Sequence, residues 1–182
     1  MSKLNLSLLR ELYLIHSPSF REYQMSDFVQ ARLKEIGVPF EVEKSGLIYG
    51  FNSQDKPLLS AHMDQVQRLP CREVLVRAGG SILCSETGLG ADDKNGIFIV
   101  LEMLRLVDKN LNFIFSVQEE VGSPVLEQFL SRSGIEDLNI PYALVFDRKG
   151  WGDIIGSHNH YCVKDLENDI ADLGFGYSPA AG

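Results

Sequence analysis

Residues 58–64 read Leu-Leu-Ser-Ala-His-Met-Asp, an apolar run that ends in two side chains of the kind that bind metals. A short run rich in apolar residues predicts a buried strand, here over residues 57–61 and directly followed by His62. Asp64 follows two residues later and could accept the second ring N–H of His62, which would fix the tautomer of a metal-binding imidazole. A lone His-x-Asp sequence is weak evidence for a metal site, so the case for one depends on further candidate ligands elsewhere in the chain.

Two further apolar runs end in acidic residues in the same way. Residues 113–117 precede Glu119 and Glu120, and residues 143–146 precede Asp147. In a sheet with helices on its faces, ligands bind beyond the carboxyl ends of the strands. These acidic residues are therefore expected beside His62, at one edge of one sheet.

The remaining elements follow from apolar periodicity and turn residues. Helices are predicted at residues 4–15, 25–36, around 97–101, from Ser123-Pro124 to about 134, and at 166–173. Further β-structure is predicted at 40–51 and in a hairpin over 73–84 that turns at Gly79-Gly80. Strands that alternate with helices predict the fold class α/β: a three-layer, mixed β-sheet with helices on both faces.

Composition excludes several classes of protein. The 182 residues are 45% hydrophobic and 23% charged, which is typical of a globular chain. The formal net charge of -8 argues against a nucleic-acid partner, because an acidic surface repels phosphate. No apolar run approaches the ~20 residues of a membrane span, so no membrane partner is expected. Three cysteines without a Cys-x-x-Cys pair indicate reduced thiols and a cytoplasmic protein.

Metal binding is the simplest reason to gather these acidic residues. A glycine-rich sequence at residues 88–94 adds Asp92 and Asp93 at the start of the predicted helix around residues 97–101. Carboxylates gathered at one edge repel one another unless cations neutralise them. One imidazole with several carboxylates suits zinc, with cobalt or manganese as alternatives.

Together these sequences resemble the co-catalytic two-zinc exopeptidases, a family that includes bacterial leucyl aminopeptidases, tripeptidases and glutamate carboxypeptidases. The matches cover nearly the whole chain in the family's order: residues 60–64, 89–94, 118–122 and 146–147, and an opening Ser17-Pro18-Ser19 followed by Glu22. The resemblance implies a zinc-exopeptidase-like catalytic domain with two divalent metal ions. It also implies hydrolysis of peptide bonds near a chain terminus, with small peptides as substrates.

The resemblance assigns four residues to the metals. His62 and Asp147 would bind one ion and Glu120 the other. Asp92 would bridge both ions, through a cis peptide to Asp93. The family's remaining ligand, a histidine for the second metal, has no clear match before residue 182.

Two further residues would be catalytic. Glu119 would be the general base for a water activated by both metals, and Asp64 would orient His62. Glu119 is expected to point away from Glu120, because neighbouring side chains at a strand end face opposite ways.

The spacing of the ligands bears on the domain organisation. Only 27 residues separate Asp64 from Asp92, and 26 separate Glu120 from Asp147, so neither gap holds an inserted lid domain. Residues 1–182 are expected to form a single catalytic domain that lacks the family's last strand or strands and helix. An uncovered apolar sheet edge would favour a homo-oligomer.

Several alternatives stay open at this point. A related zinc amidase or deacylase would have the same metal centre, and Arg148 and Lys149 could hold the carboxylate of an acylated amino acid. A catalytically impaired relative could act as a binding or structural subunit. The missing ligand could be absent, His158, His160 or a residue of another chain. The sequence does not decide the physiological metal, the substrate side chain, or aminopeptidase against carboxypeptidase activity.

Overall fold

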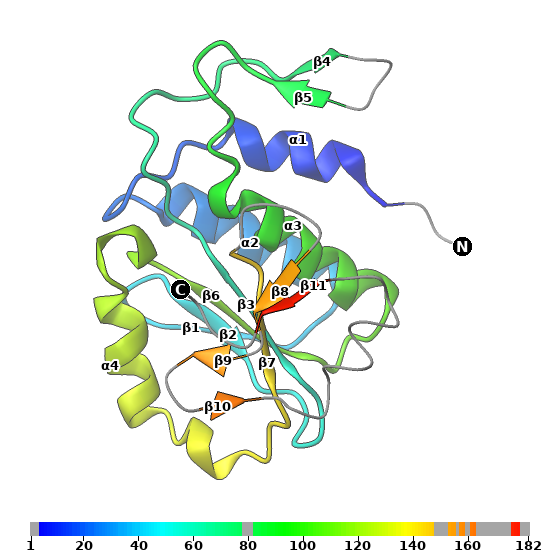
Figure 1. Cartoon of the computed structure of the whole chain (residues 1–182), viewed down its shortest axis with the longest axis vertical. Coiled ribbons are helices and arrows are strands. Elements are labelled where there is room, and N and C mark those ends of the chain that lie inside the picture. Colours follow the sequence, from blue (N-terminus) through cyan, green and yellow to red (C-terminus); the bar gives the residue numbers. More distant parts are fainter. Residues whose placement is uncertain are drawn as a thin grey trace. The chain divides into compact units, whose positions relative to one another are not determined.

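The computed structural model (Figure 1) describes residues 4–77 and 82–147, apart from the side chain at position 136, together with the backbone of four later strands. The chain divides into two compact units, Met1–Asp147 and Arg148–Gly182. In the second unit, β11 (Gly176–Ser178) pairs in parallel with β8 (Asp153–Ile155), and β10 (Tyr161–Cys162) pairs with β9 (Ser157–His158). The predicted helix at 166–173 and turn at Gly79-Gly80 lie outside the described residues.

A mixed sheet of five strands forms the centre of the first unit, in the order β1-β2-β6-β3-β7. The strands are β1 (Glu41–Val42), β2 (Ile48–Gly50), β3 (Leu58–His62), β6 (Asn112–Ser116) and β7 (Ala143–Val145). β3 lies between β6 and β7 and runs parallel to both. Residues that follow these three strands therefore emerge at the same edge of the sheet.

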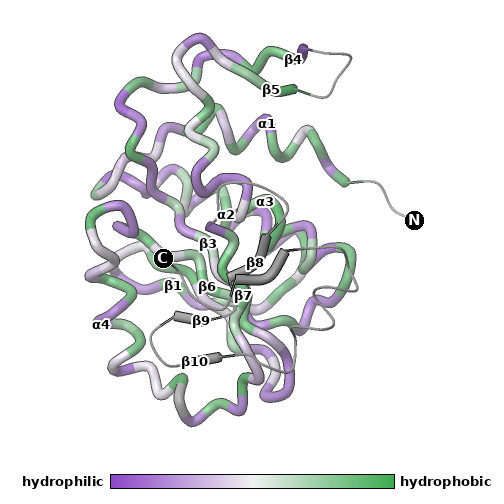
Figure 2. The backbone as a smooth tube through the Cα atoms, in the orientation of Figure 1, coloured by the Kyte–Doolittle hydropathy of each residue, from purple (hydrophilic) through white to green (hydrophobic). Residues whose placement is uncertain are grey.

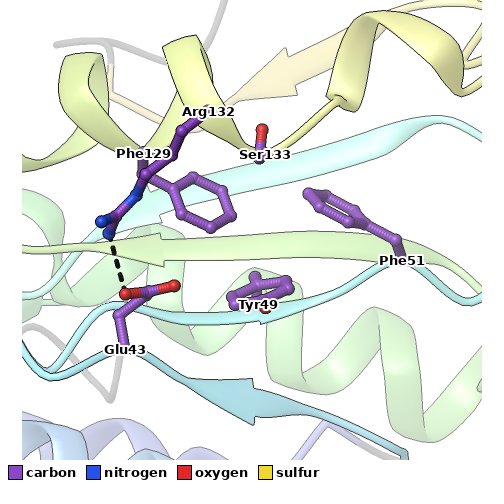
Figure 3. A pocket seen from close by; sticks show the side chains of 6 residues that line it. All are labelled: Glu43, Tyr49, Phe51, Phe129, Arg132 and Ser133. Atoms are coloured by element: carbon purple, nitrogen blue, oxygen red, sulfur yellow. Dashed lines mark hydrogen bonds and ion pairs between the residues drawn. The ribbon is translucent and has the colours of Figure 1, made fainter.

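Helices cover both faces of this sheet. They are α1 (Leu6–Leu14), α2 (Tyr23–Ile36), α3 (Ala91–Leu106) and α4 (Pro124–Arg132), with 3-10 turns η2 (Glu119–Val121) and η3 (Ile135–Asp137). α3 packs against β3 and contacts α1 and α2. Figure 3 shows α4 across the strands from the other helices, with the ring of Phe129 next to Tyr49 at a centroid distance of 4.8 Å. The predicted α/β fold with helices on both faces is confirmed.

The core lies where the inner faces of the helices meet the sheet. On α2 the fully buried residues Met25, Val29 and Leu33 recur every four positions and form one stripe. Phe113 and Phe115 of β6 are likewise fully buried. Figure 2 shows the hydrophobic colouring of the central strands. A separate hairpin pairs β4 (Leu75–Arg77) with β5 (Ile82–Cys84).

Two local expectations are wrong. The continuous apolar run at residues 97–101 predicts a helix that is buried all round, but Ile99 of α3 is 37% exposed, so one side of this helix faces solvent. A serine directly before Pro124 predicts an N-cap for α4, yet the φ of Ser123 is 56° and its side chain makes no capping hydrogen bond. Cys71 and Cys84 are free thiols, as predicted. Among the described residues, no helix has the length and apolar character needed to cross a membrane.

Candidate metal centre

Four carboxylates lie around one buried imidazole at the carboxyl ends of β3, β6 and β7. His62, the last residue of β3, is 3% exposed. Its Nε2 lies 3.2 Å from Asp92 Oδ1 and 3.9 Å from both Glu119 Oε2 and Asp147 Oδ1. Glu120 completes the cluster. The structure therefore brings together every metal-type residue that the sequence predicted within the described chain.

The donor atoms fall into two groups that could each hold a metal ion. One consists of His62, Glu119 and Asp147, and the other of His62, Asp92 and Glu120. Within each group one nitrogen or oxygen per residue lies within 4.8 Å of the others. Imidazole with carboxylates is a donor set that zinc accepts, so the residues present fit the expected ion. The first group contains Glu119, a residue predicted as base and not as ligand.

Asp92 is set by an irregular backbone at the start of α3. Gly90 adopts left-handed angles, with a φ of 58°, and the peptide between Asp92 and Asp93 is cis, as the resemblance implied. The carboxylate of Asp93 turns into the protein and accepts hydrogen bonds from Gly96 N at 2.9 Å and His62 N at 3.3 Å. Asp92 is left facing outward, with a side chain that is 67% exposed.

Asp64 connects the two strand ends through its carboxylate. Oδ1 accepts a hydrogen bond from Glu119 N at 2.9 Å, and Oδ2 accepts one from Glu120 N at 3.2 Å. His62 Nδ1 lies 3.3 Å from Oδ1, which is within ion-pair distance. Asp64 thus holds the backbone of the acidic turn as well as facing the imidazole, which the sequence did not predict.

Glu119 and Glu120 do not continue a strand. Gln118 has a φ of 59°, and the next three residues form the 3-10 turn η2. Because both amides bend toward Asp64, both carboxylates join groups around His62. The expectation that their side chains point opposite ways, which assumed strand geometry, has no basis in this turn.

Burial and the close approach of several carboxylates to one imidazole shift the pKa values of the cluster. Burial lowers the pKa of His62, but Asp64 and Asp93 outweigh it and raise that pKa to about 9. Burial raises the pKa of Asp93 to about 8. It also raises the pKa values of Glu119 and Asp147, which His62 lowers and neighbouring carboxylates raise further. A bound cation would relieve this repulsion.

Some residues near the site were not predicted from the sequence, and others lie outside the described residues. Gly96 was not singled out, although a glycine three residues after an aspartate at a helix start was a visible signal. Asp93 was named beside Asp92, but the hydrogen bonds that it accepts from Gly96 N and His62 N were not expected. Arg148, Lys149 and His160 lie outside the described residues, and for His158 only the backbone is described.

Among the comparisons with known proteins, no family model matches the chain. Over 170 residues the chain is 33% identical to a LysW-lysine/LysW-ornithine hydrolase of Pyrococcus abyssi, covering 89% of this chain and 45% of that protein. The chain thus spans about half the length of this curated relative.

Solved structures share the fold. A tripeptidase from Staphylococcus aureus matches with a TM-score of 0.66 and 22% identity, over 83% of this chain and 45% of that one. An aminopeptidase from the archaeon Desulfurococcus kamchatkensis matches with a TM-score of 0.62 and 17% identity, over 97% of this chain and 80% of that one. These proteins are named as peptidases or as a hydrolase, and the chain shares the α/β fold of the two peptidases, in agreement with the resemblance drawn from its motifs.

Proposed function

We propose that this chain carries the metal centre of a metal-dependent hydrolase that cleaves peptide bonds near a chain terminus, in the manner of an aminopeptidase. The observation that carries the proposal is the convergence of Asp92, Glu119, Glu120 and Asp147 on the imidazole of His62. Four carboxylates around one buried base repel one another when no cation is bound, and a bound divalent cation would neutralise that repulsion.

The chain's own residues divide into ligands and a base. His62, Asp92 and Asp147 would hold one divalent ion, and Asp92 with Glu120 the other. Two such ions, zinc or else cobalt or manganese, supply Lewis-acid polarisation of the scissile carbonyl and acidify a water. In this assignment, which follows the family resemblance and gives His62 to the first ion alone, the second ion would have two protein ligands among the described residues, so we expect it to bind more weakly than the first.

Glu119 is suited to move the proton. Its backbone is fixed by the hydrogen bond from its N–H to Asp64, while its side chain is 37% exposed and lies 3.9 Å from His62. Burial and the nearby Asp147 raise the pKa of its carboxyl, while His62 lowers it. A carboxylate with a raised pKa is the stronger base. It would take a proton from the attacking water and pass it to the leaving amine.

A second candidate is an amidase that acts on an acylated amino acid. It is favoured by the 33% identity to a hydrolase named for LysW-lysine and LysW-ornithine. The metal centre and the base would be the same, so only the substrate separates the two activities. The small peptide substrate, the homo-oligomer and the cytoplasmic location stay predictions.

Metal content and hydrolysis test the proposal together. The purified chain would be analysed for bound metal, then assayed with zinc, cobalt or manganese against aminoacyl reporters and N-acylated amino acids. Bound metal with cleavage of either class supports a hydrolase and chooses between the candidates. Bound metal without cleavage indicates a binding or structural subunit. A chain that binds no divalent metal would refute the proposed centre; Asp55→Asn, in an exposed loop, is the control variant.

A further inference from the structure

We propose that residues 17–22, here named the N-terminal brace, hold the two strand ends that carry the metal-type residues in register, with Ser19 and Glu22 as positioning residues. The proposal rests on the proposed function for its consequence, which is metal affinity. Its basis is that one short segment makes side-chain hydrogen bonds to the loop after β3 and to the loop after β6.

Ser19 completes the hydrogen bonding of Asp64. Its Oγ donates to Asp64 Oδ2 at 2.7 Å, the same oxygen that accepts from Glu120 N. Asp64 is 1% exposed, so water cannot readily replace a lost hydrogen-bond donor. A buried carboxylate that loses one of its donors is therefore destabilised. Ser19 is the partner of Asp64 that comes from outside β3 and the acidic turn. It therefore fixes the carboxylate that in turn fixes Glu119 and Glu120.

Glu22 supports the acidic turn from the other end. It is 6% exposed, and its Oε1 accepts a hydrogen bond from Gln118 N at 3.1 Å. Gln118 has a φ of 59°, a left-handed conformation that is unfavourable for a residue with a Cβ and persists only where its surroundings hold it. Glu22 directly precedes α2 and accepts Ser26 N through its backbone, so it is anchored to a core helix.

The backbone of the brace is tied to the loop after β3. Gln65 N donates to Ser17 O at 3.0 Å, and Ser17 N donates to Gln65 Oε1 at 3.4 Å. Pro18 and Gln65 form an isolated parallel bridge. Phe20 then takes a left-handed φ of 70°, which turns the chain between Ser19 and Glu22. The first residues of the brace thus contact the loop after β3, and its last residue contacts the turn after β6.

The consequence is that the separation of His62 from Glu119 and Glu120 depends on a segment that contains none of the proposed metal ligands. A residue that orients a ligand through another group typically alters metal affinity about 10–100-fold when it is removed. Ser19→Ala and Glu22→Ala should each weaken zinc binding by roughly this factor. Ser19→Thr and Glu22→Gln keep the donor and the acceptor, and should restore most of the affinity.

The test combines two measurements on the full chain. Zinc affinity is measured by titration calorimetry for the wild type and the four variants. Hydrogen exchange of the Glu119 and Glu120 amides is measured by NMR on the metal-free proteins. The control is Ser26→Ala, which also removes a buried hydroxyl, one that donates to Gly46 O at 3.0 Å away from the cluster.

The brace is supported if Ser19→Ala and Glu22→Ala lose zinc affinity and speed exchange of the two amides by about tenfold, while Ser26→Ala does neither. It is overturned if exchange and affinity match those of Ser26→Ala. If the wild type binds no zinc, the proposed function fails, yet the exchange rates still decide for or against the brace. If Ser19→Ala does not fold, Glu22→Ala and the two conservative variants give the same answer.

Discussion

The backbone of Glu119 is held by a hydrogen bond, while its side chain is partly exposed. A single substitution of this side chain can therefore test its proposed role as the general base. Glu119→Gln removes the proton acceptor but keeps the shape and the N–H that donates to Asp64. We expect metal binding within a few fold of the wild type and hydrolysis reduced by about 10²–10⁴-fold or more. Steady-state rates and metal titration on the same samples provide the measurement. Loss of metal, or unchanged turnover, would mean that Glu119 is not the base.

Two groups in the cluster should make the stability of the metal-free protein depend on pH. The pKa of His62 is raised from 6.5 to about 9, despite burial, by Asp64 and Asp93, and burial raises that of Asp93 from 3.8 to about 8. Both bind a proton more tightly when folded, so their contribution is lost as the pH rises through these values. Asp64, whose pKa is lowered, acts in the opposite direction, but only in the acid range.

The free energy of unfolding of the metal-free protein should therefore fall between about pH 6.5 and pH 9. Urea titrations in chelator across this range provide the check. His62→Gln should flatten the fall above pH 8, since it removes the group with the higher pKa. Above about pH 8 the buried Lys94, whose pKa burial lowers to about 8, acts in the opposite direction, so the range below pH 8 decides. A stability that rises between about pH 6.5 and pH 8 would contradict the prediction.

At the scale of elements, the start of α3 depends on a glycine. Gly96 lies inside the helix, where exchange to alanine usually stabilises by about 0.5–1 kcal/mol. Here an added Cβ would collide with both carboxylate oxygens of Asp93, which accepts hydrogen bonds from Gly96 N and His62 N. Gly96→Ala should instead destabilise by about 1–3 kcal/mol and weaken metal binding. Thermal unfolding with and without zinc tests this; a rise in melting temperature would contradict the collision.

The central strands could be predicted because their signal is local. Apolar runs at residues 58–61, 113–117 and 143–146 end in polar residues, and parallel pairing of β3 with β6 and β7 follows from the alternation with helices. His62 and Asp147 therefore came out in the right place. The predicted hairpin at 73–84 also corresponds to β4 and β5.

The acidic turn could not be predicted, because its shape is set by a distant residue. Asp64 is 55 residues before Glu119 in the sequence, and its carboxylate bends the chain into η2 where strand geometry was expected. The contacts of Ser19 and Glu22 are equally long-range. Periodicity describes which face of an element is buried, but it does not reveal which buried polar groups meet across elements.

Pairing of the edge strand β7 between two copies of the chain could produce a dimer. β7 is the last strand in the order of the first unit, and its Val145 is 65% exposed. Exposed apolar edge strands favour pairing between copies. We expect sedimentation velocity to show a concentration-dependent dimer that Val145→Lys reduces. Val107→Lys, at a 72% exposed valine after α3, is the control. Equal effects of the two variants, or a monomer at all concentrations, would rule out this edge.

The carboxylates around His62 are proposed to form a metal centre. Anomalous X-ray scattering at the zinc edge, from crystals of the full chain soaked in zinc, would locate any bound ion. We expect a strong peak in contact with His62, Asp92 and Asp147, and a weaker one between Asp92 and Glu120. Zinc bound elsewhere on the chain, with no peak touching His62, would contradict it.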